Sequence, residues 1–256
     1  MPAKIAKMGD GRNRGFTGWL RTMANLLISA SLLNAQSIKG VYQEQLKIPD
    51  NIRQLDNPAI ESAVAAQLNK MNKTTILYYD NGESFFEQLS KTNDAQQGFQ
   101  SNINVQIQTG GSGCYYKNRK NNESISQEYI MDKAFLITEP LKSQWKLVSG
   151  EKKIGNYLCN KAINDKNEIA WYCPEIPIND GPYLFQGLPG LILEVETATK
   201  TITMQTIEFK AVIKDKIQPP KTGKKISRDE FNKLLAKKKE ELGVNSGKGG
   251  VSVIKI

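Results

Sequence analysis

The chain has 256 residues and a hydrophobic fraction of 39%, which is enough for a packed core in one or two domains. It contains 35 lysine and arginine residues, 26 aspartate and glutamate residues, and no histidine. The absence of histidine excludes Ser-His-Asp and Cys-His nucleophile systems and histidine ligands to a metal. Any catalysis would therefore depend on carboxylate, lysine, tyrosine or thiol groups.

The net charge of +9 is concentrated near the two ends of the sequence. Residues 1–35 carry five basic side chains and one aspartate, and residues 210–256 carry thirteen basic and five acidic side chains. The body between them, residues 36–209, has a net charge of −3. Because a nucleic-acid module carries its basic residues on the folded domain, we expect no nucleic-acid partner.

Residues 1–35 have the pattern of a secretory signal peptide. Basic side chains up to Arg21 precede a short apolar run from Met23 to Leu33, and Ala35 is a small residue at a plausible cleavage site. The run is shorter than the roughly 20 residues that span a bilayer, so no transmembrane span is predicted. We expect export to the periplasm, the outer membrane or the exterior.

The first half of the mature chain alternates strand and helix signals. A strand is predicted over Ile38–Ile48, followed by a helix that begins at Asn57-Pro58, with asparagine as its N-cap. Thr75–Glu87 reads as a hairpin around Asn81-Gly82, a strong two-residue turn signal. Alternating apolar residues predict a further strand over Ile103–Ile107.

Short strands follow one another from Glu128 onward without crossover helices, which favours an antiparallel sheet. The predicted fold is therefore mainly β (α+β): a curved, mostly antiparallel sheet in residues 36–218, with one packed helix. A basic segment follows in residues 219–256, with a helix over 228–242 that opens at the capping box Ser227–Glu230. The predicted strands are 128–131, 134–138, 145–148, 191–196 and 201–208.

Two of the three cysteines are predicted to form a disulfide. The strand-like segments Ile154–Ile163 and Glu168–Cys173 flank a loop at 165–167, in which Asn167 tolerates the left-handed conformation. Pairing Asn164 with Glu168 and continuing that register places Cys159 opposite Cys173. Because disulfides persist in exported proteins, we expect these two cysteines to pair and Cys114 to be left over.

Residues 145–196 contain the most distinctive motifs. Trp145-Lys146-Leu147, Lys153–Ala162 and Trp171-Tyr172 occur in order, followed by Gly181–Phe185 and the hexapeptide Gly187–Ile192, which reads GLPGLI. This order resembles the GLPGLI family of exported proteins from Gram-negative bacteria. The resemblance implies an exported, β-rich protein, and it supplies no catalytic residues and no cofactor.

The GLPGLI hexapeptide begins as a loop that enters a strand, with a type II turn expected at Pro189-Gly190. One interpretation makes this loop a binding site for a ligand or partner, with aromatic walls from the preceding segment. The competing interpretation is a turn that only orients Leu191, Leu193 and Val195 into the core. The candidate binding residues are Tyr183, Phe185, Gly187, Leu188, Pro189 and Gly190.

We expect a non-enzymatic binding or assembly protein whose partner is an envelope protein or an apolar ligand, with no cofactor, no metal site and no catalytic residue. Glu194 and Glu196 lie two residues apart, on one face of a strand, and we expect that face to point to solvent. The first alternative is a secreted hydrolase that uses these carboxylates or Asp180. The second is a thiol or soft-metal carrier built from Cys114 and the cysteine pair.

Overall fold

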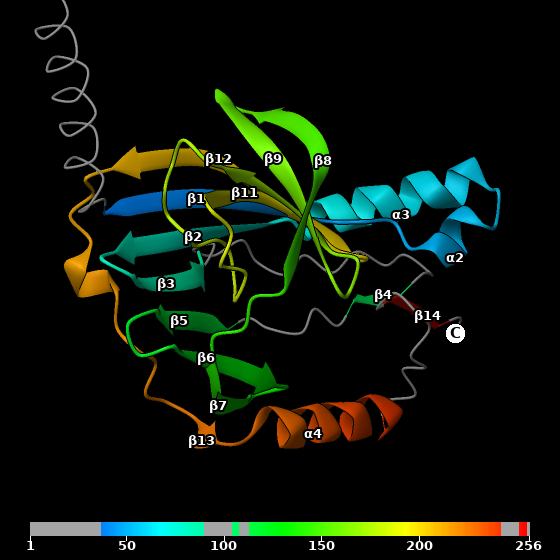
Figure 1. Ribbon diagram of the computed structural model, residues 1–256. Coiled ribbons are helices and arrows are strands. Elements are labelled where there is room, and N and C mark those ends of the chain that lie inside the picture. Colours follow the sequence, from blue (N-terminus) through cyan, green and yellow to red (C-terminus); the bar gives the residue numbers. More distant parts are fainter. Residues whose placement is uncertain (1–36, 90–103, 108–112, 242–250, 255–256) are drawn as a thin grey trace, which may run out of the picture. The chain divides into compact units, whose positions relative to one another are not determined.

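The computed structural model describes residues 37–89, 104–107, 113–241 and 251–254 (Figure 1). Most of them belong to one open twelve-stranded sheet in the order β13-β7-β6-β5-β3-β2-β1-β12-β11-β10-β9-β8. Neighbouring strands are antiparallel, except for the short parallel pair β13 and β7. The mainly β, mostly antiparallel architecture predicted from the sequence is confirmed.

The strands of this sheet are β1 (Ile38–Leu46), β2 (Lys73–Asp80), β3 (Glu83–Gln88), β5 (Cys114–Asn118), β6 (Glu123–Ile130), β7 (Lys133–Pro140), β8 (Trp145–Ile154), β9 (Tyr157–Asn164), β10 (Ile169–Cys173), β11 (Leu191–Glu196), β12 (Lys200–Phe209) and β13 (Lys224–Lys225). A separate antiparallel pair joins β4 (Asn104–Ile107) to β14 (Val251–Ile254). The predicted signal peptide and its cleavage site lie outside the described residues.

The two hairpins that were predicted from their turn residues, β2–β3 and β9–β10, are both present. β2 and β3 are joined by Asn81 and Gly82, which both have positive φ angles of 50° and 86°. In the β9–β10 hairpin, the Asn164 N–H donates to the Glu168 carbonyl oxygen at 3.1 Å, and Asn167 adopts a φ of 59°. Ala162 pairs with Ala170, which is the predicted register.

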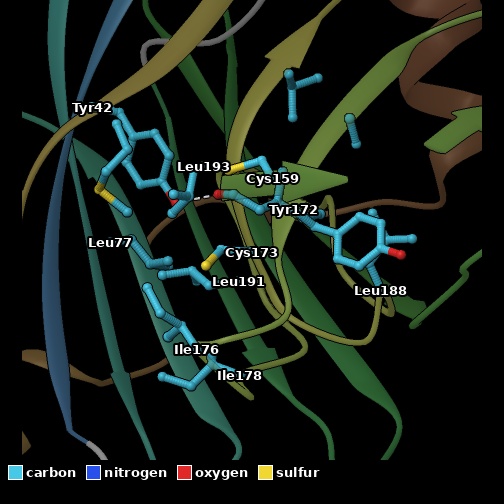
Figure 2. Close-up of a cluster of buried hydrophobic side chains, with 14 of the residues drawn as sticks. Tyr42, Leu77, Cys159, Tyr172, Cys173, Ile176, Ile178, Leu188, Leu191 and Leu193 are labelled. Atoms are coloured by element: carbon cyan, nitrogen blue, oxygen red, sulfur yellow. Dashed lines mark hydrogen bonds between the residues drawn. The ribbon is translucent and has the colours of Figure 1, made fainter. Parts of the chain in front are cut away.

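The main core lies on one face of the sheet, which we call the inner face and define by Ile38, Tyr42 and Glu44 of β1. These three residues alternate with half-buried ones along the strand and are at most 2% exposed. The side chains of the inner face and those on both faces of β11 belong to one large hydrophobic cluster. Figure 2 shows a part of this cluster, around Tyr42, Leu77 and Leu191. The core therefore follows from alternation along half-buried strands.

The helices pack at different places. α2 (Asp50–Arg53) and α3 (Pro58–Lys70) form a small cluster with the end of β1, and the Asn57 side chain accepts the N–H groups of Ala59 and Ile60 as predicted for an N-cap. α4 (Arg228–Glu241) contacts the sheet through Phe231, whose ring lies 5.6 Å from that of Phe135 in β7. A short 3-10 turn (η1) spans Lys214–Lys216. None of the helices in the described ranges is long and apolar enough to cross a bilayer.

Candidate functional site

The segment between β10 and β11, residues 174–190, contains most of the candidate binding residues, and we call it the connecting segment. It is long for a link between two adjacent antiparallel strands. Ile176, Ile178 and Leu188 belong to the main core and are at most 3% exposed. The connecting segment is therefore packed against the sheet over much of its length and is not a free surface loop.

The aromatic residues of the connecting segment are turned toward the domain. The Tyr183 ring lies 4.7 Å from the Phe86 ring and 5.1 Å from the Tyr115 ring. Phe185 lies 6.1 Å from Trp145 of β8. These two residues were predicted as walls of a ligand loop, and the structure places them against other aromatic side chains of the chain itself.

The glycines of the hexapeptide allow close backbone approach. A Cβ atom at Gly190 would lie 2.2 Å from the Cys173 carbonyl oxygen, and one at Gly187, which has a φ of 91°, would lie 2.2 Å from Ser143 Oγ. The Gly190 N–H donates to the Leu188 carbonyl oxygen at 2.8 Å, so the chain makes a tighter turn around Pro189 than the expected type II turn. Pro189 itself is exposed.

Two basic residues at the end of β5 hold the connecting segment on the inner face. The Lys117 ammonium donates to Asp180, to the Gly181 carbonyl oxygen at 2.7 Å and to the Phe185 carbonyl oxygen at 3.4 Å. Arg119 donates to the Asn179 carbonyl oxygen at 2.7 Å. This arrangement was not predicted, because the strand that carries Lys117 was not recognised from the sequence.

Asp180 lies at the centre of this buried contact. Its carboxylate accepts Lys117, the Ser84 hydroxyl at 2.8 Å and the Gly181 N–H at 2.6 Å, and it is fully buried. Burial lowers the pKa of Lys117, while the charge and hydrogen bond of Asp180 oppose that shift. With all these donors around it, Asp180 is an anchor of the fold in this structure.

Glu194 and Glu196 share one face of β11 as predicted, but the expectation that both point to solvent is wrong. Glu194 is 4% exposed, ion-paired with Lys152 of β8, and accepts the Thr203 hydroxyl at 2.9 Å. Glu196 accepts the Trp171 indole N–H at 3.0 Å. The long side chains of the neighbouring strands cover these carboxylates, which alternation along a single strand does not reveal.

The charges around Glu196 determine its protonation. Partial burial acts to raise the pKa of this carboxyl, but the Trp171 hydrogen bond and the positive charges of Lys152 and Lys47 lower it below its ordinary value. Glu196 therefore stays ionised in this environment. It is held as the acceptor of an indole N–H and as the partner of two ammonium groups.

The predicted Cys159–Cys173 disulfide is absent, and all three cysteines are free thiols. The β9–β10 ladder ends at Asn160 and Tyr172, one residue before the two cysteines would pair. Beyond that point each sulfur contacts the backbone of its own strand or turn: Cys159 lies 3.8 Å from the Tyr157 carbonyl oxygen, and the N–H groups after Cys173 point at its sulfur. Both side chains are fully buried and belong to the hydrophobic cluster of which Figure 2 draws a part.

The alternative function as a soft-metal carrier requires the three cysteine side chains to lie close together. Within the described ranges, no three cysteine, aspartate or glutamate side chains are grouped closely enough to hold a metal ion. Cys114 instead lies at the start of β5, where its sulfur is 3.6 Å from Gln127 Oε1. Burial and the charge of Glu87 raise the pKa of the Cys114 thiol to about 11.

A second buried polar cluster was also missed. Glu44 of β1 is 2% exposed, and its carboxylate accepts the Tyr183 hydroxyl and the Lys200 ammonium, the latter at 2.9 Å. Lys200 also lies 4.0 Å from the centre of the Tyr183 ring. Alternation with Ile38 and Tyr42 was the available signal, because it places Glu44 on the same buried face of β1.

One family model is similar to a part of the chain. Residues 163–194, which run from β9 through the connecting segment into β11, match a family described as a protein of unknown function (Porph_ging). No curated protein matches the sequence significantly.

Two solved structures of PNGF-II, in space groups C2 and P21, match this chain. They share 17% and 16% sequence identity with this chain, cover 79% of it, and have TM-scores of 0.49 and 0.48. The chain corresponds to about a third of the length of those proteins, with 33% and 34% covered.

Proposed function

We propose that this chain is an exported, non-enzymatic binding or assembly protein of the GLPGLI type, which docks an envelope partner on the outer edge of β8. The observation that carries the proposal is the position of β8. It is a ten-residue strand at the end of the sheet and pairs only with β9 among the described strands (Figure 1). An edge of this length leaves a row of backbone donors and acceptors for another strand.

The side chains of the β8–β9 hairpin fit this role. Leu147 and Leu158 are 56% and 49% exposed, and the register places both on the face that carries Ala162. Lys146 and Lys153 on β8 are exposed as well. An extended partner strand with apolar residues and acidic neighbours would match both the hydrophobic surface and the positive charge.

The carboxylates considered for hydrolysis favour a non-enzymatic function. Asp180 is held by Lys117, Glu194 by Lys152, and Glu196 by the Trp171 indole. A general acid or nucleophile must reach the substrate, and these groups are engaged by donors within the domain. The cysteines likewise have raised pKa values, which makes them poor nucleophiles at neutral pH.

Site-specific photo-crosslinking in the native host tests the docking surface. A photoreactive amino acid at Leu147 should capture one discrete envelope protein, and the same residue at Leu234 of α4, which is 42% exposed, should not capture it. In a chain that carries the photoreactive amino acid at Leu158 instead, Leu147→Glu should reduce the yield of the crosslinked envelope protein. Equal capture from both positions, or none from Leu147, would contradict docking at β8.

Export is tested separately on the protein from its own host. Its amino terminus should begin at or near Gln36, and the protein should fractionate with the envelope. Recovery of intact residues 1–35 in the cytoplasm would contradict this part of the proposal and leave the docking surface to be judged on its own.

A further inference from the structure

Residues 210–223, which join β12 to β13, lie across the face of the sheet opposite to the inner face, and we call them the crossing segment. At its start, the Lys210 N–H donates to the carbonyl oxygen of Ser37, just before β1, at 2.7 Å. At its end, the Thr222 carbonyl oxygen accepts the Gln127 side chain of β6 at 2.6 Å, and β13 then pairs with β7. The crossing segment therefore runs from β1 to β7, whereas β8 ends the strand order on the other side of β12.

The crossing segment packs on the sheet on one side only. Ala211 and Ile213 are 6% and 5% exposed and form a small apolar cluster with Ile76 and Tyr78 of β2. Val212 lies between the two buried residues and is fully exposed. Because both of its neighbours are fixed against the sheet, Val212 points away from the sheet and presents an apolar side chain to solvent.

The outward side of the crossing segment is also basic. The segment contains one aspartate, Asp215, and four lysines that are all exposed: Lys210, Lys214, Lys216 and Lys221. In the part of the chain that the structure describes, no carboxylate lies within ion-pair distance of these four lysines. The two residues of β13 that follow are exposed lysines as well. This positive charge is local, because residues 36–209 carry a net charge of −3.

The amino-terminal end of β1 lies at the same corner of the sheet. The carbonyl oxygen of Ser37 accepts the Lys210 N–H, and the Ser37 hydroxyl donates to the Ala211 carbonyl oxygen at 2.8 Å. The residues before Ser37 include the apolar run to Leu33 that is predicted as part of a signal peptide. During the proposed export, a leader held in a membrane would tether the domain beside Lys210, so this one step rests on the proposed function.

We propose that the crossing segment is a contact surface for a membrane that contains anionic phospholipids. Its four lysines pair with the lipid phosphate groups, and Val212 enters the boundary between head groups and acyl chains. An acidic protein could also match the lysines, but a fully exposed valine between Lys210 and Lys214 favours a surface that is both anionic and apolar. Because β8 lies at the far end of the strand order, a partner docked there and the membrane use different residues.

The test is co-sedimentation of the protein recovered from its own host with vesicles of phosphatidylcholine alone, or of phosphatidylcholine and phosphatidylglycerol in equal parts. The protein should bind the anionic vesicles at least about tenfold more tightly, and added salt should reduce this difference because it screens exposed charges. The amino terminus of the same sample is determined in parallel. Retention of residues 1–35 would contradict export, whereas the comparison of lysine variants decides on the membrane contact.

Two triple variants show whether the crossing segment itself binds the vesicles. Replacing three of its lysines should weaken binding to anionic vesicles about 100-fold, since each lysine near the surface contributes about fivefold: Lys214→Gln, Lys216→Gln and Lys221→Gln. The control removes the same charge at three exposed lysines elsewhere and should keep the wild-type affinity within about threefold: Lys142→Gln, Lys166→Gln and Lys237→Gln. Equal losses in the two triple variants would overturn the proposal, because net charge alone would then explain the binding.

Val212→Ser distinguishes a membrane from an acidic protein. It should weaken vesicle binding about threefold by removing apolar area from the contact, and it should leave the unfolding midpoint unchanged because the side chain is fully exposed. Soluble polyglutamate is the probe for an acidic protein. Tighter binding of polyglutamate than of anionic vesicles, together with vesicle binding that is insensitive to Val212→Ser, would overturn the proposal. Absence of binding to anionic vesicles, or equal binding to both kinds of vesicle, would overturn it as well.

Discussion

Lys117 of β5 and Asp180 of the connecting segment form an ion pair in which both side chains are excluded from solvent, with exposures of 0% and 1%. They are 63 residues apart in the sequence. The pair joins the sheet to the segment that carries the most distinctive sequence motif. A buried pair of this kind costs desolvation on both sides, so its value depends on the added hydrogen bonds to Gly181, Phe185 and Ser84.

Removing one partner of this pair should be strongly destabilising. Lys117→Met and Asp180→Asn should each lower the free energy of unfolding by about 3–5 kcal/mol, because each leaves polar groups of its partner buried and unpaired. The double variant should cost much less than the sum of the two single changes. Urea unfolding followed by circular dichroism measures all three values.

The control for this cycle is an exposed pair. Lys238 and Glu241 on α4 lie 2.9 Å apart with side-chain exposures of 34% and 48%, and Lys238→Met should change the unfolding free energy by less than about 0.5 kcal/mol. Additive effects of Lys117→Met and Asp180→Asn would show that the two side chains do not act as a pair.

Gly190 should be intolerant of even the smallest side chain. An added Cβ would lie 2.2 Å from the Cys173 carbonyl oxygen, and that oxygen belongs to the backbone and cannot move aside freely. Gly190→Ala should therefore destabilise the protein by about 3 kcal/mol. Thermal and urea unfolding of the variant give the measurement.

A variant at Gly155 distinguishes the effect of steric crowding from the effect of backbone strain. It has a φ of 58°, and a Cβ atom added there would meet nothing within 4 Å, so Gly155→Ala should cost only the strain of the left-handed conformation, about 1–2 kcal/mol. If Gly155→Ala costs as much as Gly190→Ala, the close approach to Cys173 does not explain why glycine is needed at Gly190.

The two glutamates of β11 should differ in their contribution to stability. Glu194→Gln should cost about 1–3 kcal/mol, because the 4%-exposed carboxylate pairs with Lys152 and accepts the Thr203 hydroxyl. Glu196→Gln should cost less than about 1 kcal/mol, since its contacts are more exposed. Urea unfolding at pH 7 distinguishes them, and a larger loss for Glu196→Gln would contradict this ranking.

The lowered pKa of Glu196 makes the stability of the fold depend on pH. A carboxyl whose pKa is lower in the folded state stabilises the fold above its ordinary pKa and loses that contribution as pH falls through the folded value. Wild-type stability should therefore fall more than that of Glu196→Gln between neutral pH and pH 3. Parallel curves for the two proteins would show that the contacts of Glu196 do not affect its ionisation.

Local sequence signals predicted the elements of this fold that depend on local chemistry. Asn81-Gly82 and Asn167 fixed two turns because they tolerate positive φ, and Asn57 with Pro58 fixed the start of α3. The strand with Lys117 was missed because a charged residue in a buried position contradicts the alternation on which strand prediction depends. Its partner Asp180 lies 63 residues away, and no local pattern links the two.

The candidate site shows the same division. Sequence placed Glu194 and Glu196 on one face correctly, because that follows from the period of a strand, but it could not show that Lys152 and Trp171 cover them. It also predicted the hairpin register, which the ladder follows as far as Asn160 and Tyr172, one residue short of Cys159 and Cys173. Whether two cysteines in such a hairpin form a disulfide depends on where the ladder ends and on which way each sulfur points. The spacing of the cysteines in the sequence determines neither.

The thiols should differ sharply in reactivity. Burial, with the charge of Glu87, raises the pKa of the Cys114 thiol from 9.0 to about 11, so its thiolate fraction near pH 8 should be about 100-fold below that of an unperturbed thiol. Because the thiolate is the nucleophile, alkylation of Cys114 should speed up about tenfold per pH unit until pH approaches 11. Cys159 and Cys173 are fully buried, and burial raises both pKa values, that of Cys159 to about 12, so they should react only on unfolding.

Iodoacetamide labelling of the folded protein, followed by peptide mapping, measures this order. Cys114→Ser should remove the slow native-state reaction and leave two thiols that appear only in urea, because Cys114 is half-buried and the other two are in the core. Three thiols should be counted in total after denaturation without reductant. A count of one, with a peptide that joins Cys159 to Cys173, would show that the free-thiol state is not the one the protein adopts, and rapid native labelling of Cys159 would show that the core around β9 opens readily.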